Sequence, residues 1–138
     1  MPMKGALAAM LLMAAACSFG AVPLPTATAD FGASHVSLAR GSYCWSSGGQ
    51  ATCADSADPE TLLRTGYLKP VTVPAGARAQ ITFSVQPSRV AIALGQEEPA
   101  GSEASFTLPA QSGRYVYIIT GSFHEGDVSF FLPVDVTR

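Results

Sequence analysis

Short apolar stretches alternate with turn-forming residues from His35 to the end of the chain. Between residues 79 and 85 every second residue is apolar, which is the period-2 pattern of a half-buried strand. The other stretches expected to form strands are 71–73, 89–94, 104–108, 114–120 and 127–136. Short strands at this spacing, separated by turn residues, are typical of an all-β sandwich. We therefore predict an all-β, immunoglobulin-like β-sandwich that occupies residues 35–138.

Two connections and one helix interrupt the strand pattern. Residues 95–102 are polar and predict a loop, and residues 121–126 predict a wide turn in a terminal hairpin. Asp58 suits a helix N-cap, Pro59 the first helical position and Gly66 the position after the last turn. The sequence therefore predicts one short helical insertion.

Cys44 and Cys53 enclose a segment with Ser-Ser-Gly-Gly at its centre, which favours a tight turn. A hairpin at this position would bring the two thiols together across adjacent strands. In the chain-entropy view, a disulfide that closes so short a loop stabilises the fold by about 2.5–3 kcal/mol. Such a bond persists in an oxidising compartment. Zinc would need a second pair of ligands, which the sequence does not offer.

The first sixteen residues have the pattern of an export signal. Lys4 supplies the only charge before an apolar run over residues 6–16. A positive residue followed by an apolar run of this length is typical of a signal peptide, and the run is shorter than the roughly 20 residues of a transmembrane helix. We predict a signal peptide over residues 1–16.

Two processing routes fit the end of this signal. Residues 14–16 form an Ala-x-Ala site for ordinary signal peptidase, and together with Cys17 they resemble a bacterial lipobox in which Ala14 replaces the usual leucine. The chain has three cysteines, so lipidation of Cys17 would leave the other two to pair. We favour a lipid anchor on Cys17, with secretion as a soluble protein that carries a spare thiol as the alternative.

Residues 17–34 combine the lipidated cysteine with a Pro-, Thr-, Ala- and Gly-rich segment that has little to bury, which predicts a flexible tether. An ordinary disordered N-terminus would have the same composition. Without its signal the chain keeps seven basic and ten acidic residues, and the basic ones are scattered singly. This distribution argues against nucleic-acid binding, and the length suits one domain.

Several of these elements resemble a group of small, functionally uncharacterised lipoproteins of Gram-positive bacteria. The likeness rests on residues 42–45, Cys53-Ala54-Asp55, the Pro59–Leu63 segment and the Lys69–Gly76 segment, and it extends to the final hairpin with Gly126-Asp127. It covers nearly the whole mature domain. The resemblance implies an extracytoplasmic lipoprotein with an immunoglobulin-like fold, and it implies neither a catalytic residue nor a substrate.

Enzyme and metal chemistry find little support in the residues. His35 and His124 lie outside any recognisable nucleophile motif, and the mature chain has no methionine for a blue-copper site. Glu125 and Asp127 beside His124 suggest a weak divalent-ion or paired-carboxylate site, but a solvated turn is the favoured interpretation. We predict no catalytic residue, no cofactor and no metal, and we keep these three turn residues as candidate ligand contacts.

Four further residues are candidate ligand contacts: Tyr43, Trp45, Asp55 and Tyr67. Tyr43 and Trp45 flank Cys44, so strand alternation puts both on the face opposite the cysteine. Facing inward, they belong to the core, which we favour; facing outward with Tyr67, they would form an aromatic patch for a glycan or peptide. Asp55 accepts hydrogen bonds near the helix start or contacts a ligand.

The leading functional expectation is an exported, lipid-anchored cell-envelope protein that acts as a non-enzymatic binding or accessory module. Its partners would be the membrane, through lipid on Cys17, and a protein, peptide or glycan. Two alternatives stay open. One is a protease inhibitor presented on immunoglobulin-like loops, although the Asn-Pro-Thr-Thr-Gly loop of chagasin-type inhibitors is missing. The other is an extracytoplasmic enzyme with an unrecognised site.

Overall fold

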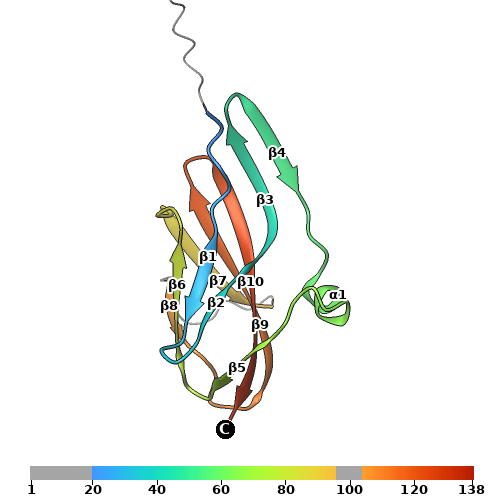
Figure 1. Cartoon of the computed structure of the whole chain (residues 1–138), viewed down its shortest axis with the longest axis vertical. Coiled ribbons are helices and arrows are strands. Elements are labelled where there is room, and N and C mark those ends of the chain that lie inside the picture. The colour runs from blue at the N-terminus through green and yellow to red at the C-terminus, as the bar shows by residue number, and fades with distance from the viewer. Residues whose placement is uncertain (1–19, 96–103) are drawn as a thin grey trace, which may run out of the picture.

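Two β-sheets face each other in the computed structural model, which describes residues 20–95 and 104–138 (Figure 1). The first sheet has the order β2 (His35–Ser37), β1 (Ala27–Asp30), β6 (Arg78–Phe83) and β8 (Ser105–Thr107). The second has the order β4 (Gln50–Ala54), β3 (Ala39–Ser47), β10 (Gly126–Thr137), β9 (Gly113–Phe123) and β7 (Arg89–Leu94). β5 (Val71–Pro74) also pairs with β10, and this pair is parallel. The predicted all-β sandwich is confirmed.

The inward faces of the two sheets form the core. One cluster of buried side chains includes Ile81 from the first sheet and Ile119, Leu132 and Val134 from the second. A second cluster lies around Trp45, whose ring meets Phe123 edge to face with 5.8 Å between ring centroids. Burial alternates along β6, as the sequence pattern predicts, but on β10 residues 130–134 are buried without a break.

β9 and β10 form the long central hairpin of the second sheet. Their pairing runs from Gly126 opposite Phe123 to Val136 opposite Gly113. Only His124 and Glu125 remain for the turn, so the predicted wide turn over residues 121–126 is wrong. The strands continue further than expected because the Phe123 ring is buried in the second core cluster.

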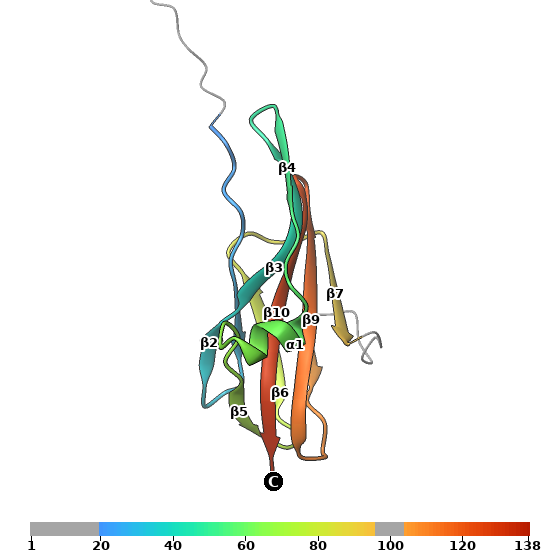
Figure 2. The same cartoon turned by 90° about the vertical axis from the view of Figure 1, so that its right-hand side faces the viewer.

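The β3–β4 hairpin contains the predicted disulfide. Cys44 lies directly opposite Cys53 in the strand register, and a disulfide bond joins them. The turn between the strands is formed by Gly48 and Gly49, whose φ angles of 62° and 79° are those that glycine adopts without a steric penalty. The hairpin protrudes at one end of the molecule, opposite the C-terminus (Figures 1 and 2).

The structure corrects two sequence-based boundaries. The predicted tether over residues 17–34 is too long, because β1 over Ala27–Asp30 lies between β2 and β6 and pairs with both. Ala27 and Ala29 are buried, and such small apolar residues gave no strand signal. The strand predicted over 79–85 ends at Phe83, and Val85 is exposed beyond the end of β6.

The predicted helix is α1 (Pro59–Arg64), which connects β4 to β5. Asp58 caps it by accepting hydrogen bonds from the Thr61 backbone N–H at 2.9 Å and the Thr61 hydroxyl at 2.8 Å. These bonds hold the pKa of Asp58 below its ordinary value of 3.8. Gly66 follows the helix with a φ of 77°, as the sequence predicts.

Three predictions concern residues outside the described part of the chain: the signal peptide over 1–16, the lipidated Cys17, and all but Gly95 of the polar loop over 95–102. Within residues 20–95 and 104–138, no helix has the length and apolar character needed to cross a bilayer.

Candidate functional site

β10 changes its pairing partner halfway along its length. It pairs with β3 as far as Phe131, opposite Ala39, and with β5 from Val134, opposite Val71. Between these pairs, Leu132 and Pro133 have no pairing residue on the side away from β9. A proline lacks the backbone N–H that a neighbouring strand would need, so it suits a place where pairing lapses. The change of partner opens the sheet at this point.

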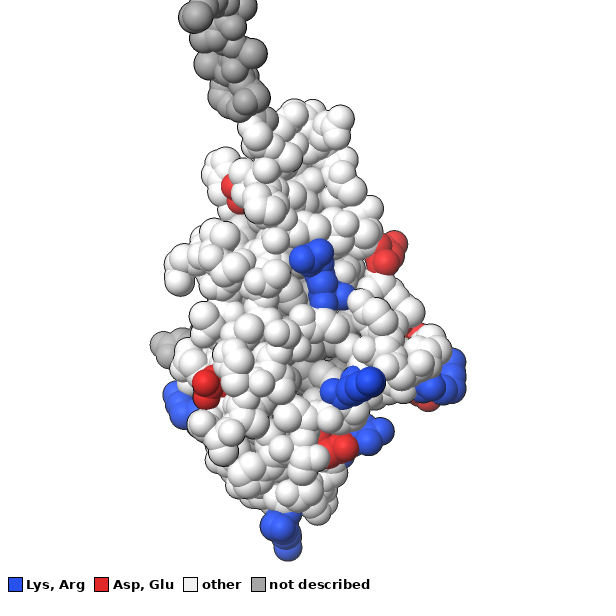
Figure 3. Space-filling view, in the orientation of Figure 1, with Lys and Arg blue, Asp and Glu red and all other residues white. Residues whose placement is uncertain are grey.

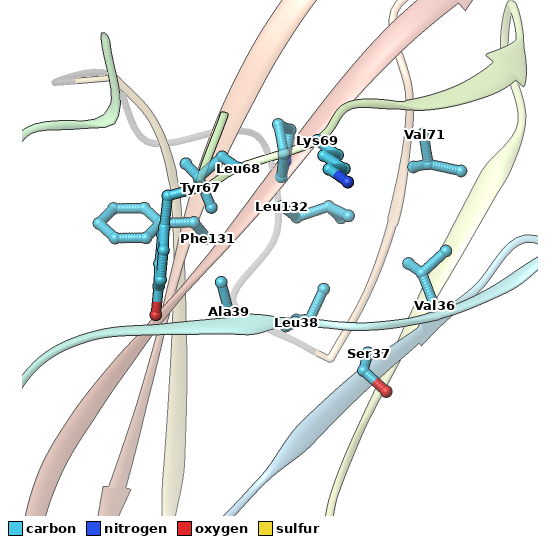
Figure 4. A pocket seen from close by; sticks show the side chains of 11 residues that line it. Val36, Ser37, Leu38, Ala39, Tyr67, Leu68, Lys69, Val71, Phe131 and Leu132 are labelled. Atoms are coloured by element: carbon cyan, nitrogen blue, oxygen red, sulfur yellow. The ribbon is translucent and has the colours of Figure 1, made fainter. Parts of the chain in front are cut away.

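A groove of about 220 Å³ lies over the opening, and we call it the partner-switch groove. Its floor is formed by Leu68, Phe131 and Leu132, which are 4%, 5% and 1% exposed. Val71 lines one wall, and Val36, Leu38 and Ala39 line the other (Figure 4). The groove is therefore an apolar slot that the fold itself produces, not a gap between loops.

Two functional groups stand at the rim of this slot. Tyr67 is 64% exposed, and Lys69 is also exposed. Both come from the segment after α1, where the Leu68 backbone N–H donates to the Leu62 carbonyl at 3.1 Å and the Leu68 side chain is buried. Extended backbone alternates its side chains, so anchoring Leu68 inward turns both neighbours outward. Figure 4 shows the Lys69 amine and the Tyr67 ring beside the apolar floor.

The chemistry of the groove is that of a binding surface with one cationic end. Its lining contains one amine, one phenol and the Ser37 hydroxyl, and neither a carboxylate nor an imidazole. An apolar slot can desolvate aliphatic or aromatic groups, and a lysine at its rim can pair with an anionic group beside them. The arrangement is complementary to an amphipathic segment.

The predicted aromatic patch is divided between two places. Trp45 is 7% exposed and packs in the core, as favoured, and Tyr43 is half-buried beside it. The two line a second hollow together with Ala21, Val22 and Leu24 of the N-terminal segment. Tyr67 belongs to the partner-switch groove instead. The outward-facing patch of three aromatic residues does not form.

The turn candidates lie at the β9–β10 tip. The His124 side chain is 98% exposed, and its Nδ1 is 4.0 Å from a Glu125 carboxylate oxygen. Asp127 is exposed and lies opposite Cys44. In the described part of the chain, no group of three or more His, Cys, Asp or Glu side chains could hold a metal ion. His124 and Glu125 form the turn, with the Glu125 side chain 21% exposed, and Asp127 belongs to β10.

Asp55 is exposed in the connection to α1, and its side chain forms no hydrogen bond with any residue that the structure describes. The expected role of accepting bonds at the helix start belongs to Asp58 instead. His35 is the first residue of β2, with its Nδ1 3.5 Å from an Asp30 carboxylate oxygen. Neither residue borders the partner-switch groove.

Sequence reasoning found Tyr67 but missed the rest of the groove. Lys69 and Pro133 were the available signals, because an isolated lysine precedes an apolar strand and a proline interrupts the longest one. The pattern could not say that Val36 and Val71 face each other, since this depends on which strands pair with β10.

Comparison of the chain with protein-family models, with curated proteins and with solved structures yields no match.

Proposed function

We propose that this chain is an exported, lipid-anchored cell-envelope protein that binds a peptide segment in its partner-switch groove without catalysing a reaction. The ligand is an extended peptide whose apolar side chains enter the slot and whose acidic group pairs with Lys69. The observation that carries this proposal is the groove itself, an apolar slot with a single cation at its rim.

The export part of the proposal is supported by the cysteines. The bond between Cys44 and Cys53 requires an oxidising compartment to persist, and it leaves Cys17 as the odd thiol. An apolar run with a lysine in front of it precedes that cysteine. A lipid on Cys17 explains all three observations together.

The size and charge of the groove support a peptide as the ligand. Sites for whole small molecules usually have volumes of roughly 300–1,000 Å³. The partner-switch groove has about 220 Å³, which suits a few side chains of a longer segment. With Lys69 at the rim and no carboxylate in the lining, an acidic group on that segment is complementary.

Binding can be tested with a phage-displayed library of random 12-residue peptides selected against the mature domain. We expect enrichment of sequences that place an Asp or Glu beside two or three apolar residues. Lys69→Glu replaces attraction with repulsion and should weaken the selected peptides about five- to tenfold. Tyr67→Ala should weaken them as well, since it removes an exposed ring at the rim.

Arg78→Glu is the matched control, because Arg78 is exposed on β6 and does not line the groove. It introduces the same charge change as Lys69→Glu and should leave peptide affinity unchanged. Equal weakening by both variants would mean that only net charge matters, and no weakening by either would place binding elsewhere. Intact-mass analysis of the N-terminus in a bacterial host tests the anchor separately, and an unmodified Cys17 would refute it.

A further inference from the structure

The chain that follows Cys17 is fastened to the sandwich almost at once. The Val22 backbone N–H donates to the Ser47 hydroxyl, and the Val22 carbonyl accepts a 2.9 Å hydrogen bond from the Trp45 indole N–H. Leu24 then packs against the second core cluster, and Pro25 is buried. Val22 is thus held beside the turn of the β3–β4 hairpin.

This attachment leaves very little chain for a tether. Four residues lie between Cys17 and the docked Val22, so five Cα–Cα steps join them, and an extended chain spans at most about 3.6 Å per step. Val22 therefore lies no more than about 18 Å from the Cys17 Cα atom. The predicted spacer of residues 17–34 would have let the domain lie much further from the anchor than so short a link can reach.

The β3–β4 hairpin at this end carries no ionisable side chain; the nearest are His124, Glu125 and Asp127 at the β9–β10 tip, which meets the hairpin at Ser46. Residues 41–54, which include the whole disulfide-bonded loop, contain no Asp, Glu, Lys, Arg or His, and neither do residues 20–29. On the face shown in Figure 3, lysine and arginine side chains lie singly over the middle and lower parts, and one acidic side chain lies near the upper end. An uncharged surface can approach lipid headgroups without the cost of desolvating fixed charges.

We propose that Val22 and residues 46–51, together called the hairpin end, form a surface that rests against the lipid bilayer when the chain is anchored through Cys17. This inference depends on the proposed anchor and goes beyond it by fixing which end of the sandwich faces the membrane. Because the surface is uncharged, the orientation does not require anionic lipid.

The orientation has a consequence for the partner-switch groove. Gly126 lies opposite Trp45, so the groove at Leu132 is about nine residues from the hairpin turn along the strands. At about 3.3 Å per residue this distance is about 30 Å. The hairpin end therefore holds the groove clear of the bilayer and open to partners in the envelope.

Paramagnetic relaxation in nanodiscs tests the orientation on the lipidated chain from Cys17 to Arg138. The probe is a gadolinium chelate on lipid headgroups in phosphatidylcholine, with and without phosphatidylglycerol. Gly48 and Gly49 report on the hairpin end, and Gly76 reports on the opposite end, about 45 Å away by strand register. We expect at least about fivefold greater relaxation enhancement at Gly48 and Gly49 than at Gly76, in both lipids.

Two variants check that the short link causes the orientation. A flexible Gly-Ser segment of about 20 residues inserted after Ser18 should reduce the difference to less than about twofold. Trp45→Phe combined with Ser47→Ala removes both side chains that bond to Val22 while keeping a ring in the core, and it should also reduce the difference. Equal enhancement at the two ends of the unmodified chain would overturn the inference.

Failure of the anchor and failure of the orientation can be told apart. If mass analysis finds Cys17 unmodified in cells, a diacyl-maleimide can be attached to it, since Cys44 and Cys53 are in a disulfide. Relaxation measurements on that chain in nanodiscs then test the orientation, whatever processing Cys17 undergoes in cells. If Cys17 is lipidated and relaxation enhancement is equal at the two ends, the anchor is supported and the proposed membrane-facing surface is refuted.

Discussion

The two hairpins of the second sheet have turns of the same length but different sources of stability. β9–β10 lies in the middle of the sheet, and most of β10 is buried. β4 lies at the edge, pairs only with β3, and has four exposed residues followed by a half-buried one. The central hairpin is held by apolar burial, whereas the edge hairpin depends on the bond between Cys44 and Cys53. A hairpin that buries little needs a covalent link.

The two hairpins also touch at their tips. The Ser46 backbone N–H donates to the Glu125 carbonyl at 2.8 Å. Gly126 has a φ of 149°, and a Cβ atom there would lie 2.0 Å from the Cys44 carbonyl oxygen. The close approach of the backbones therefore requires a glycine. Through this contact the stable hairpin supports the weaker one.

The largest expected effect comes from the buried side of the central hairpin. Phe130→Ala removes a ring that is 1% exposed and packs against Phe83, and should lower the free energy of unfolding by about 3–5 kcal/mol. Thr52→Ala on exposed β4 should change it by less than about 0.5 kcal/mol. Urea unfolding measures both, and similar losses in the two variants would contradict the contrast between the hairpins.

Gly126→Ala should have the next largest effect, a loss of about 3 kcal/mol, because its methyl group cannot fit against the Cys44 carbonyl. The amides of β3 and β4 should exchange faster than in the parent chain, since the two tips must separate. Asp127→Ala, at the exposed neighbouring position, is the control and should be nearly neutral. A fully stable Gly126→Ala variant would show that the tips do not depend on this contact.

Loss of the disulfide should cost about 2.5–3 kcal/mol. Cys44→Ser combined with Cys53→Ser should expose the β4 amides to exchange while β9–β10 keeps its protection, because burial holds the central hairpin independently. Hydrogen exchange followed by mass spectrometry distinguishes the two hairpins. If protection fell equally in both, the disulfide would support the whole sheet and not the edge alone.

Removal of the helix cap should have a smaller effect than any of these changes. Asp58→Ala removes the acceptor for the Thr61 backbone N–H, so α1 should fray and the Tm should fall slightly. Asp55→Ala is a matched control, since Asp55 is exposed and forms no side-chain hydrogen bond with the described residues. Equal Tm values for both variants would show that the cap contributes nothing to α1.

Acidification should produce the smallest effect. The Arg114 guanidinium donates to Asp135 at 2.7 Å and lowers the pKa of that carboxyl below its ordinary value of 3.8. A carboxyl whose pKa is lowered on folding stabilises the native state above about pH 4, and this stabilisation is lost as the pH falls through the folded value. Asp135→Asn should therefore lose less Tm than the parent between pH 6 and pH 2.5. Parallel pH profiles would contradict this.

Local sequence signals determined much of this fold. Alternating apolar residues identified β6 and β7 because a strand with one buried face repeats every two residues, and a long apolar run identified β10. The Gly48-Gly49 turn and the flanking cysteines fixed the register of one hairpin, and Asp58 with Pro59 fixed the start of α1. Each of these features depends on residues close together in the chain.

Long-range pairing decided the rest. β1 was missed because Ala27 and Ala29 become a strand only between β2 and β6. The partner-switch groove exists because β10 exchanges β3 for β5, and the short link to Cys17 exists because Val22 bonds to Trp45. The sequence by itself determined which segments are strands and where the chain turns, since these follow local backbone preference and period. Only the tertiary structure decided which strands meet, because that choice depends on burial shared between distant segments.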